Sequence, residues 1–452
     1  MNATERMAEF IVDTRLEDIP EKAIHMAKRS IIDTMGVALA AGAEPVAKNV
    51  SAYVRGMSKD GSATVIGAGL RCAPPWAALA NGTLGHALDF DDSNWSLMGH
   101  GTVAVIPAAL AQGEDQNASG RDIIEAFIVG FEVASKLGRG MNMGLYDNGW
   151  HPTSTLGAMG AAGAGAHLRG LDSEKTRFAL GIAASHASGV RANFGTMTKP
   201  LHAGLAAESG VRAAGLAAAG ITANTDILEA KSGYCEAFAG AGNYRLEEIT
   251  ESLGAPFVFE DPGVNLKPYP CCMSAHPSID ALRELIAEGD LTPDSVDEID
   301  VALMEPNFLN LSYHTPQTGL QGKFSGEYAL SRILMDGNLT LSTFTDDAVN
   351  EPGVRETMSK VHVHLAENVE WTPGSARPAT VTVKTTDGRT LQKTGTISRG
   401  NAALPLTDEE VHAKFMDCTA QTISSGLSGK VLSMLVQLEN EPDIRALMSL
   451  VA

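Results

Sequence analysis

Apolar and small residues recur with helical spacing through the first 260 residues. Residues 119–138 give the clearest pattern, since Ser119 and Asp122 resemble a helix start, apolar residues then follow on one face, and Gly138 fits a C-terminal stop. Two further stretches, 155–168 and 202–219, consist mostly of Ala and Gly. Because small residues let helices approach closely, these two stretches are predicted to be buried central helices of a bundle.

The pattern changes near residue 265, where apolar and polar residues begin to alternate. Residues 299–303, 361–365 and 381–383 each alternate with a period of two, which indicates strands with one buried face. Asp387-Gly388 predicts a hairpin turn between the last of these strands and the next. A helical pattern at 323–336 lies among them, so this region is predicted to be a smaller α+β domain.

The helical pattern resumes near the C-terminus, where Thr407 to Glu410 has the form of a capping box. The last 45 or so residues are expected to rejoin the first domain. The sequence therefore predicts a mainly-α protein with a large all-helical domain built from both chain ends, residues 1–264 and 403–452. The α+β domain, residues 265–402, is inserted between them.

Composition narrows the function classes. The 452 residues include 34 Lys and Arg against 54 Asp and Glu, a net charge of −20, which disfavours binding to nucleic acid or anionic membranes. The five cysteines form no CxxC pair, and neither a signal peptide nor an apolar run of membrane-spanning length is seen. We expect a cytoplasmic protein, and an anionic substrate would need a local cluster of Lys, Arg and His to bind.

The first candidate for chemistry is the segment after residue 86. Asp89, Asp91 and Asp92 follow His86 closely, and His100 comes shortly before another apolar stretch. Carboxylates and imidazoles beside buried sequence suit general acid–base catalysis, because burial and neighbouring charges tune their pKa values. The alternative is a helix end with solvated aspartates and a capping histidine. The spacing lacks the central Gly and terminal Glu of a calcium loop.

Two lysines are further candidates for binding an anionic substrate. Lys199, with Thr198 before it and Pro200 after it, is expected in an extended or turn conformation just before a helix, where amide groups and a cation can bind a carboxylate; the alternative is a surface lysine. Lys267 and His276 flank the predicted domain boundary, and ligand sites are common there. His151 precedes a small-residue helix and, taken alone, would be a capping or core residue.

Other motifs are absent or weak. The sequence has no P-loop, no GxGxxG, no HExxH and no GxSxG, so no nucleotide cofactor or zinc site of these kinds is expected. His362 and His364 lie on one face of a predicted strand without an evident third ligand, and a solvated strand is the favoured interpretation.

Four motifs together resemble the MmgE/PrpD family: HALDFDD at 86–92, TKPLHAG at 198–204, KPYPCC at 267–272 and TGLQGKFS at 318–325. Their order and spacing agree with the family over about residues 5–420. The resemblance implies an all-helical domain with an inserted α+β lid, an active site in the cleft between them, a homodimer, and no metal or cofactor. Members include 2-methylcitrate dehydratase, cis-aconitate decarboxylase and iminodisuccinate epimerase.

The resemblance also implies a set of site residues, carried over motif by motif. The residues predicted to be catalytic are Asp89, His100, His151, Lys199 and Lys267. Those predicted to bind substrate are Ser93, where Thr is common, Thr198, His276 and Tyr313. One departure lies after His100, where Gly101-Thr102 stands in place of a common His-Pro-Ser.

These members share the problem of handling a proton or a carbon bond next to a carboxylate. Lys199 and Lys267 are assigned to stabilise the enediolate charge, and His100 and His151 to move the proton. Asp89 is either a second base or the group that orients a histidine. The leading hypothesis is a metal-independent lyase that dehydrates a 2-methylcitrate-like hydroxy acid. The alternatives are an epimerase of an iminodisuccinate-like acid, a decarboxylase of a cis-aconitate-like acid, and a non-catalytic carboxylate-binding protein.

Overall fold

The computed structural model describes residues 2–367 and 377–452. Helices account for 58% of the chain and strands for 9%, which confirms the predicted mainly-α class. Two compact units are present: residues 1–266 with 407–452, and residues 267–406. Among the described residues, no helix is both long and apolar enough to cross a membrane.

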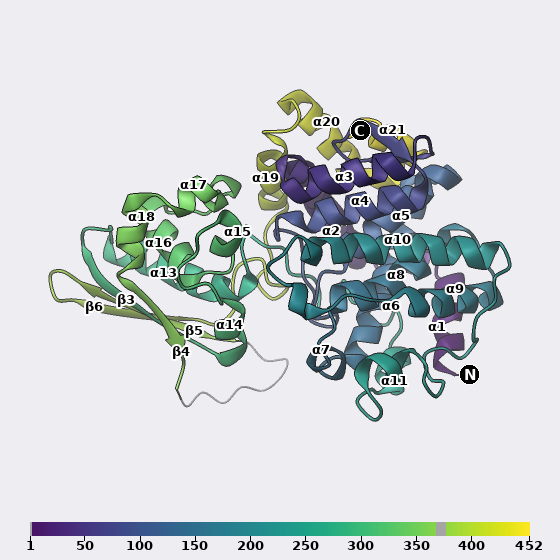
Figure 1. The fold of residues 1–452 in the computed structure, drawn as a ribbon, viewed down its shortest axis with the longest axis horizontal. Coiled ribbons are helices and arrows are strands. Elements are labelled where there is room, and N and C mark those ends of the chain that lie inside the picture. The colour runs from purple at the N-terminus through teal and green to yellow at the C-terminus, as the bar shows by residue number, and fades with distance from the viewer. Residues whose placement is uncertain (1, 368–376) are drawn as a thin grey trace. The chain divides into compact units, whose positions relative to one another are not determined.

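Five helices form the centre of the helical unit (Figure 1). They are α4 (Pro74–Ala87), α5 (Thr102–Gln116), α6 (Gly120–Met141), α8 (Pro152–Leu168) and α10 (Thr198–Ala218). Helix α10 packs against both α4 and α8, and α8 packs against α6. The two small-residue stretches predicted to be central helices thus lie in α8 and α10, and residues of both are buried.

Glycine makes the contact between α4 and α10 possible. A Cβ atom placed on Gly204 would lie 2.2 Å from the Leu79 carbonyl oxygen and 2.3 Å from Thr83 Oγ1. A Cβ on Gly82 would lie 2.9 Å from the Gly204 Cα. Only a residue without a side chain fits at Gly204 at this helix separation, so these glycines set how closely the two helices approach.

Two predicted helix boundaries are wrong for physical reasons. Helix α6 begins with the expected Ser119–Asp122 capping box but continues past Gly138 to Met141. Gly138 is a close-packing residue, since a Cβ there would lie 2.5 Å from the Ser96 carbonyl oxygen. Helix α10 begins at Thr198, so Lys199 lies in its first turn rather than in an extended segment before it.

The remaining elements of this unit surround the centre. They are α1 (Ala3–Asp13), α2 (Glu21–Ala40), α3 (Pro45–Met57), β1 (Ala63–Val65), β2 (Leu70–Cys72), α7 (Gly144–Asp147), α9 (Ser173–His186), α11 (Tyr234–Ala239) and α12 (Leu246–Thr250). The C-terminal segment adds α19 (Asp408–Thr419), α20 (Ser425–Val436) and α21 (Ile444–Met448). Helix α19 packs on α2, and Lys414 forms a 2.6 Å ion pair with the buried Asp33.

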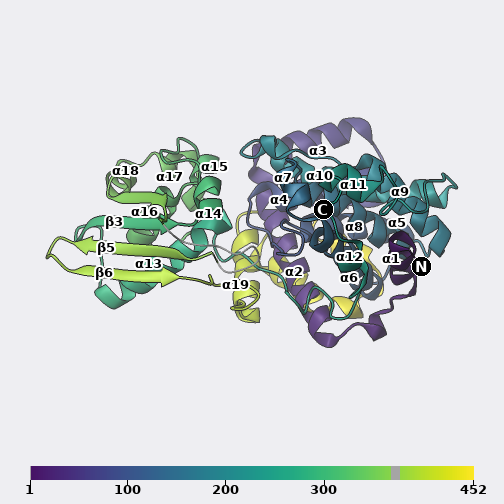
Figure 2. The same cartoon turned by 90° about the horizontal axis from the view of Figure 1, so that it is seen from below.

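The second unit is an α+β layer with a four-stranded sheet, ordered β4-β3-β5-β6. The strands are β3 (Val296–Leu303), β4 (Val361–Leu365), β5 (Ala379–Thr385) and β6 (Thr390–Gly395). Strand β3 is parallel to β4 and antiparallel to β5, and β6 is antiparallel to β5. Figure 2 shows β5 and β6 side by side.

The helices of this unit are α13 (His276–Gly289), α14 (Glu305–Asn310), α15 (Gly319–Gly322), α16 (Gly326–Asp336), α17 (Asp346–Val349) and α18 (Pro352–Met358). The apolar face of the sheet and residues of α13 and α16 share one core. The predicted strands and the Asp387-Gly388 hairpin are confirmed. His362 and His364 lie on the exposed side of β4, as expected for a solvated strand.

Replacing Gly204 with alanine tests the close contact of α4 and α10. We expect Gly204→Ala to lower the free energy of unfolding of the helical unit by about 1–3 kcal/mol, because the added methyl group forces the helices apart. Gly215→Ala is the matched control in the same helix, since a Cβ there meets no atom within 4 Å. The control should be neutral or stabilising by up to about 1 kcal/mol. Equal denaturant midpoints for the two variants would contradict this interpretation.

Candidate active site

The end of α4 turns sharply at Asp89, whose φ of 53° lies in the left-handed region. Aspartate is one of the few non-glycine residues found there, and such backbone strain clusters at functional sites. The Asp89 carboxylate meets the first turn of α10, where Lys199 Nζ lies 2.6 Å from Asp89 Oδ1. Both residues are buried. The sequence positions 89 and 199 thus meet in a buried ion pair, and the alternative of a surface lysine is wrong.

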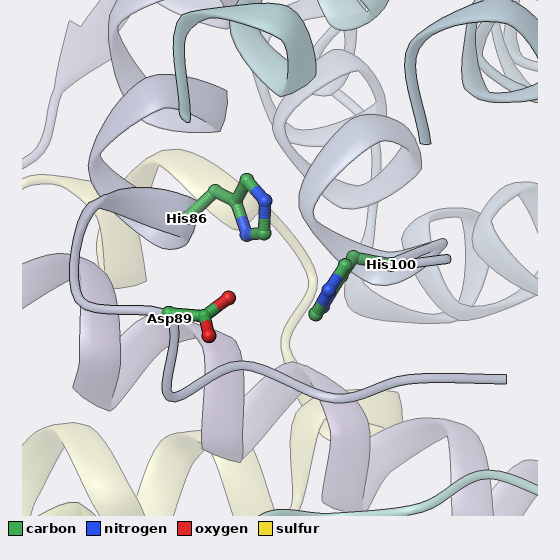
Figure 3. A group of neighbouring side chains, drawn as sticks. All are labelled: His86, Asp89 and His100. Atoms are coloured by element: carbon green, nitrogen blue, oxygen red, sulfur yellow. The ribbon is translucent and has the colours of Figure 1, made fainter. Parts of the chain in front are cut away.

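A second buried carboxylate, Asp91, lies between two imidazoles. His86 Nδ1 is 3.0 Å from both oxygens of Asp91, and His100 Nδ1 is 2.9 Å from Asp91 Oδ2. The ring centroids of His86 and His100 are 4.4 Å apart. Figure 3 shows these two rings with Asp89 beside them. The alternative of solvated aspartates at a helix end is therefore wrong.

A second pair of histidines continues the cluster. His151 is the residue before α8, but its side chain makes no capping hydrogen bond. Its Nδ1 instead lies 3.0 Å from Nδ1 of His202 on α10. The His151 ring is stacked 6.2 Å from His86. The four imidazoles come from α4, from α10, from the residue before α8 and from the loop before α5, and they form one contiguous group in which His100 is half-buried and the other three are buried.

Burial and the nearby ammonium group disfavour protonation of these rings. Burial is the main reason that the pKa of His86 is lowered to about 4 and that of His151 well below its usual value. Lys199 acts in the same direction on both pKa values, whereas Asp91 opposes the shift of His86. Burial, with Lys199, also lowers the pKa of His202. Near neutral pH these three rings are therefore uncharged, and the fixed positive charge of this group is that of Lys199.

The neighbouring carboxyl groups of Asp91 and Asp92 differ in protonation state. Burial alone would raise the pKa of Asp91, but His86 and His100 hold it well below its usual value. Burial raises the pKa of Asp92 to about 8, despite a hydrogen bond that Thr102 donates to it. Asp91 is thus ionised near neutral pH, whereas Asp92 is largely protonated. The Gly101-Thr102 departure from the family pattern supplies this hydrogen bond.

One group of side chains in the described part of the chain has metal-ligand geometry. Donor atoms of His86, Asp89 and His100 all lie within 4.8 Å of one another (Figure 3). The Asp89 carboxylate, however, is already paired with the ammonium of Lys199, which repels a cation at the same point. The donor set therefore fits a divalent ion poorly while Lys199 is charged, and the absence of a metal cofactor stays a prediction.

Of the predicted substrate-binding residues of the helical unit, one lies in a loop and the other at the start of a helix. Ser93 pairs through its backbone with Asn265, with N–O distances of 2.9 and 2.8 Å. Thr198 begins α10, one residue before Lys199. No contact tests a role in substrate binding for either residue, so both assignments stay predictions.

The other predicted site residues belong to the α+β unit. Lys267 is its first residue and is buried. His276 is buried, lies 3.2 Å through Nε2 from the Cys271 carbonyl oxygen, and packs edge-on against Tyr269. Tyr313 is half-buried. The catalytic role of Lys267 and the binding roles of His276 and Tyr313 stay predictions.

His86 and Asp91 belong to the segment that the sequence marks for acid–base chemistry, but neither they nor His202 were predicted to be site residues. All three stand inside the motifs already quoted, two in HALDFDD and one in TKPLHAG. The spacing within each motif does not show which residues meet, because the contacts join a helix end, a loop and a second helix. The signal that could have found the two histidines is their position: each stands three residues from a predicted catalytic residue in the same motif, His86 from Asp89 and His202 from Lys199.

Comparison with known proteins identifies the family to which the chain belongs. The model of the MmgE/PrpD N-terminal domain matches residues 5–247, and that of the C-terminal domain matches residues 269–438. The chain belongs to the MmgE/PrpD family. The resemblance inferred from the four motifs is thus confirmed.

Its relatives match along nearly their whole length. Human cis-aconitate decarboxylase is 30% identical over 462 residues, covering 99% of this chain and 94% of that protein. The mouse cis-aconitate decarboxylase is also 30% identical and covers 99% of this chain and 92% of that protein. A cis-aconitate decarboxylase from Aspergillus terreus is 26% identical, covering 99% of this chain and 95% of that protein.

The raised pKa of Asp92 predicts a pH dependence of stability. In the unfolded chain this carboxyl group has a pKa of about 3.9, whereas in the folded protein its pKa is about 8. Between these values the folded state holds a proton that the unfolded state has lost, so this group makes stability fall as pH rises, by up to about 1.4 kcal/mol per pH unit.

The Asp92→Asn variant removes this titration. We expect its stability relative to the unsubstituted protein to increase steadily from pH 5 to pH 8, as measured by urea unfolding at each pH. Two stability curves that run parallel over that range would show that Asp92 is ionised in the folded protein.

Proposed function

We propose that the protein is a lyase that acts on a tricarboxylate, with decarboxylation of a cis-aconitate-like acid as the first candidate reaction. The sequence alone favoured dehydration of a 2-methylcitrate-like acid. The relatives named cis-aconitate decarboxylase, which match over nearly the full chain, favour decarboxylation instead. The observation that carries the proposal is the buried Lys199–Asp89 ion pair set among four imidazoles, three of them buried.

The chemistry of such a decarboxylation explains this arrangement. The bond to the departing carboxylate breaks, and its electron pair forms a new double bond. The electron pair of the old double bond moves toward a second carboxylate, whose oxygens gain negative charge. The carbon next to that carboxylate then takes up a proton, and carbon dioxide leaves. The steps need a cation near the charged oxygens and an acid near the carbon, but no oxidant or reductant.

Lys199 is the cation that this scheme requires. Its ammonium group is buried, so it stabilises charge that develops beside it more than a solvated lysine would. Asp89 now lies 2.6 Å from this ammonium group. A substrate carboxylate would share Lys199 with Asp89 or replace Asp89 as its partner. Because the whole chain carries a charge of −20, an anionic substrate needs such a local cation. Lys267 is assigned as a second cation by family resemblance alone.

The imidazoles supply the proton transfer. His100 is the candidate acid, because the ionised Asp91 lies behind its Nδ1 and can stabilise an imidazolium. His151 stays neutral, because burial and Lys199 lower its pKa. His151 is therefore suited to accept a hydrogen bond or a proton rather than to donate one from a charged ring. The scheme uses no metal, and the homodimer and the cytoplasmic location stay predictions.

The reaction class can be tested by proton NMR with chelator-treated protein and a panel of cis-aconitate, 2-methylcitrate, citrate and iminodisuccinate. We expect cis-aconitate to be consumed, with release of carbon dioxide. Loss of water from 2-methylcitrate without turnover of cis-aconitate would favour the dehydratase instead. Interconversion of stereoisomers alone would favour the epimerase. If none of the four acids reacted, the proposed lyase would be contradicted and a carboxylate-binding protein would be favoured.

Replacing Lys199 tests the assigned role of the ammonium group. We expect Lys199→Met to lower kcat/KM by at least about 100-fold through both kcat and KM, because the charge binds the substrate and stabilises the transition state. The double variant Lys199→Met/Asp89→Asn removes the stranded carboxylate and should recover stability but not activity. Lys48→Met, at an exposed position of α3, is the control. Activity of Lys199→Met near that of the control would rule out this role.

A further inference from the structure

The side chain of Asp91 contacts two imidazoles. The carboxylate is fully buried, and its oxygens lie 3.0 Å from Nδ1 of His86 and 2.9 Å from Nδ1 of His100. The backbone carbonyl oxygen of Asp92 lies 2.7 Å from the same nitrogen of His100. Both rings therefore present Nδ1 to oxygen atoms that can only accept hydrogen bonds, provided that Asp91 is ionised.

This geometry decides which nitrogen carries the proton. A neutral imidazole has one N–H and one bare nitrogen, and a carboxylate or carbonyl oxygen requires the N–H. We propose that Asp91 is a positioning residue that fixes a proton on Nδ1 of both His86 and His100, so that Nε2 is the atom through which each ring acts. The inference rests on the proposed function, and assigns Nε2 of His100 as the proton-transferring atom.

The negative charge of this loop resides on Asp91 rather than on Asp92. Asp92 accepts a hydrogen bond from Thr102 and is close to Asp91 and Asp33, whose charges raise its pKa together with burial. Asp33 is itself paired with Lys414. With Asp92 protonated, the carboxylate of Asp91 contacts both rings. Besides the proton that each ring carries on Nδ1, Asp91 can therefore stabilise one additional proton, on one of the two rings at a time.

The second ring nitrogen of His86 is available to a ligand. His86 Nε2 is buried and has no hydrogen-bond partner among the described residues. A buried polar atom without a hydrogen bond destabilises the folded protein, and a polar ligand group at that point removes this cost. The His86 ring is close to the rings of both His100 and His151, at centroid distances of 4.4 and 6.2 Å. We therefore place His86 Nε2 where a polar group of the substrate can complete its hydrogen bonding.

The variant Asp91→Asn tests the proposal, because an amide offers one accepting oxygen and one donating nitrogen. One of the two rings must then face a donor, and its proton moves to Nε2 or its hydrogen bond is lost. We expect kcat to fall by about 10²–10⁴-fold, as for a carboxylate that sets the tautomer of a catalytic histidine, while KM changes by less than about threefold.

The matched control is Asp92→Asn in the same buried loop. This substitution replaces a largely protonated carboxyl group with an amide of the same shape and leaves the backbone carbonyl that binds His100 in place. We expect kcat within about fivefold of that of the unsubstituted protein, since the ring tautomers do not depend on this side chain. A loss of kcat in Asp91→Asn no larger than in Asp92→Asn would overturn the proposal.

A second readout does not need a substrate. Nitrogen-15 NMR of ring-labelled, ligand-free protein separates protonated from bare imidazole nitrogens, with His86→Gln and His100→Gln used for assignment. We expect Nδ1 to be protonated in both rings of the unsubstituted protein, and one ring to change in Asp91→Asn. A bare Nδ1 in either ring of the unsubstituted protein would overturn the proposal. If the substrate panel were silent but the tautomers were as expected, the proposed function alone would fail.

Discussion

The structure around the candidate site depends on how three carboxyl groups are accommodated in an apolar helical core. Asp89, Asp91 and Asp92 lie within four residues of one another and are all buried. Each is accommodated differently: Asp89 by the ammonium of Lys199, Asp91 by two imidazole N–H groups, and Asp92 by holding its proton. Burying a carboxylate without such partners would cost several kcal/mol or more. The positions of the surrounding histidines and of the lysine follow from this constraint.

Close helix packing makes these partnerships possible. Gly82 and Gly204 let α4 and α10 touch along their backbones, and the same two helices provide His86 and Lys199. A wider separation of the helices would leave Asp89 and Lys199 apart. The Ala- and Gly-rich composition of this region is therefore a requirement of the site as well as of the core. The close packing leaves the ion pair largely buried, which strengthens the electrostatic interaction on which the proposed chemistry relies.

Much of the fold could be predicted because local patterns encode it. Alternating residues identified β3, β4 and β5, Asp387-Gly388 identified the hairpin, and the capping boxes at Ser119 and Thr407 are present. The errors arose where tertiary contacts decide. Gly138 has the appearance of a helix stop, but it is small because a neighbouring chain segment passes close to it. Lys199 has the appearance of a loop residue because proline follows it, yet proline is tolerated in the first turn of a helix.

The site itself was only partly predictable. Asp89, His100, His151 and Lys199 were named from the motifs, and the structure places them in one contiguous group with their neighbours. The partners His86, Asp91 and His202 could not be assigned, because a linear motif does not show which imidazole faces which carboxylate. Lys267, His276 and Tyr313 belong to the other unit, and their assignments rest on family resemblance.

The central claim is that a side-chain imidazole of this cluster delivers a proton to a carbon atom next to a substrate carboxylate. The most direct measurement is the turnover of cis-aconitate in heavy water, followed by NMR analysis of the product. An imidazole proton exchanges with solvent but approaches the carbon from one side only. The account therefore predicts one deuterium in the product, on a single face of one carbon. Product without deuterium, or with deuterium distributed equally over both faces, would contradict it.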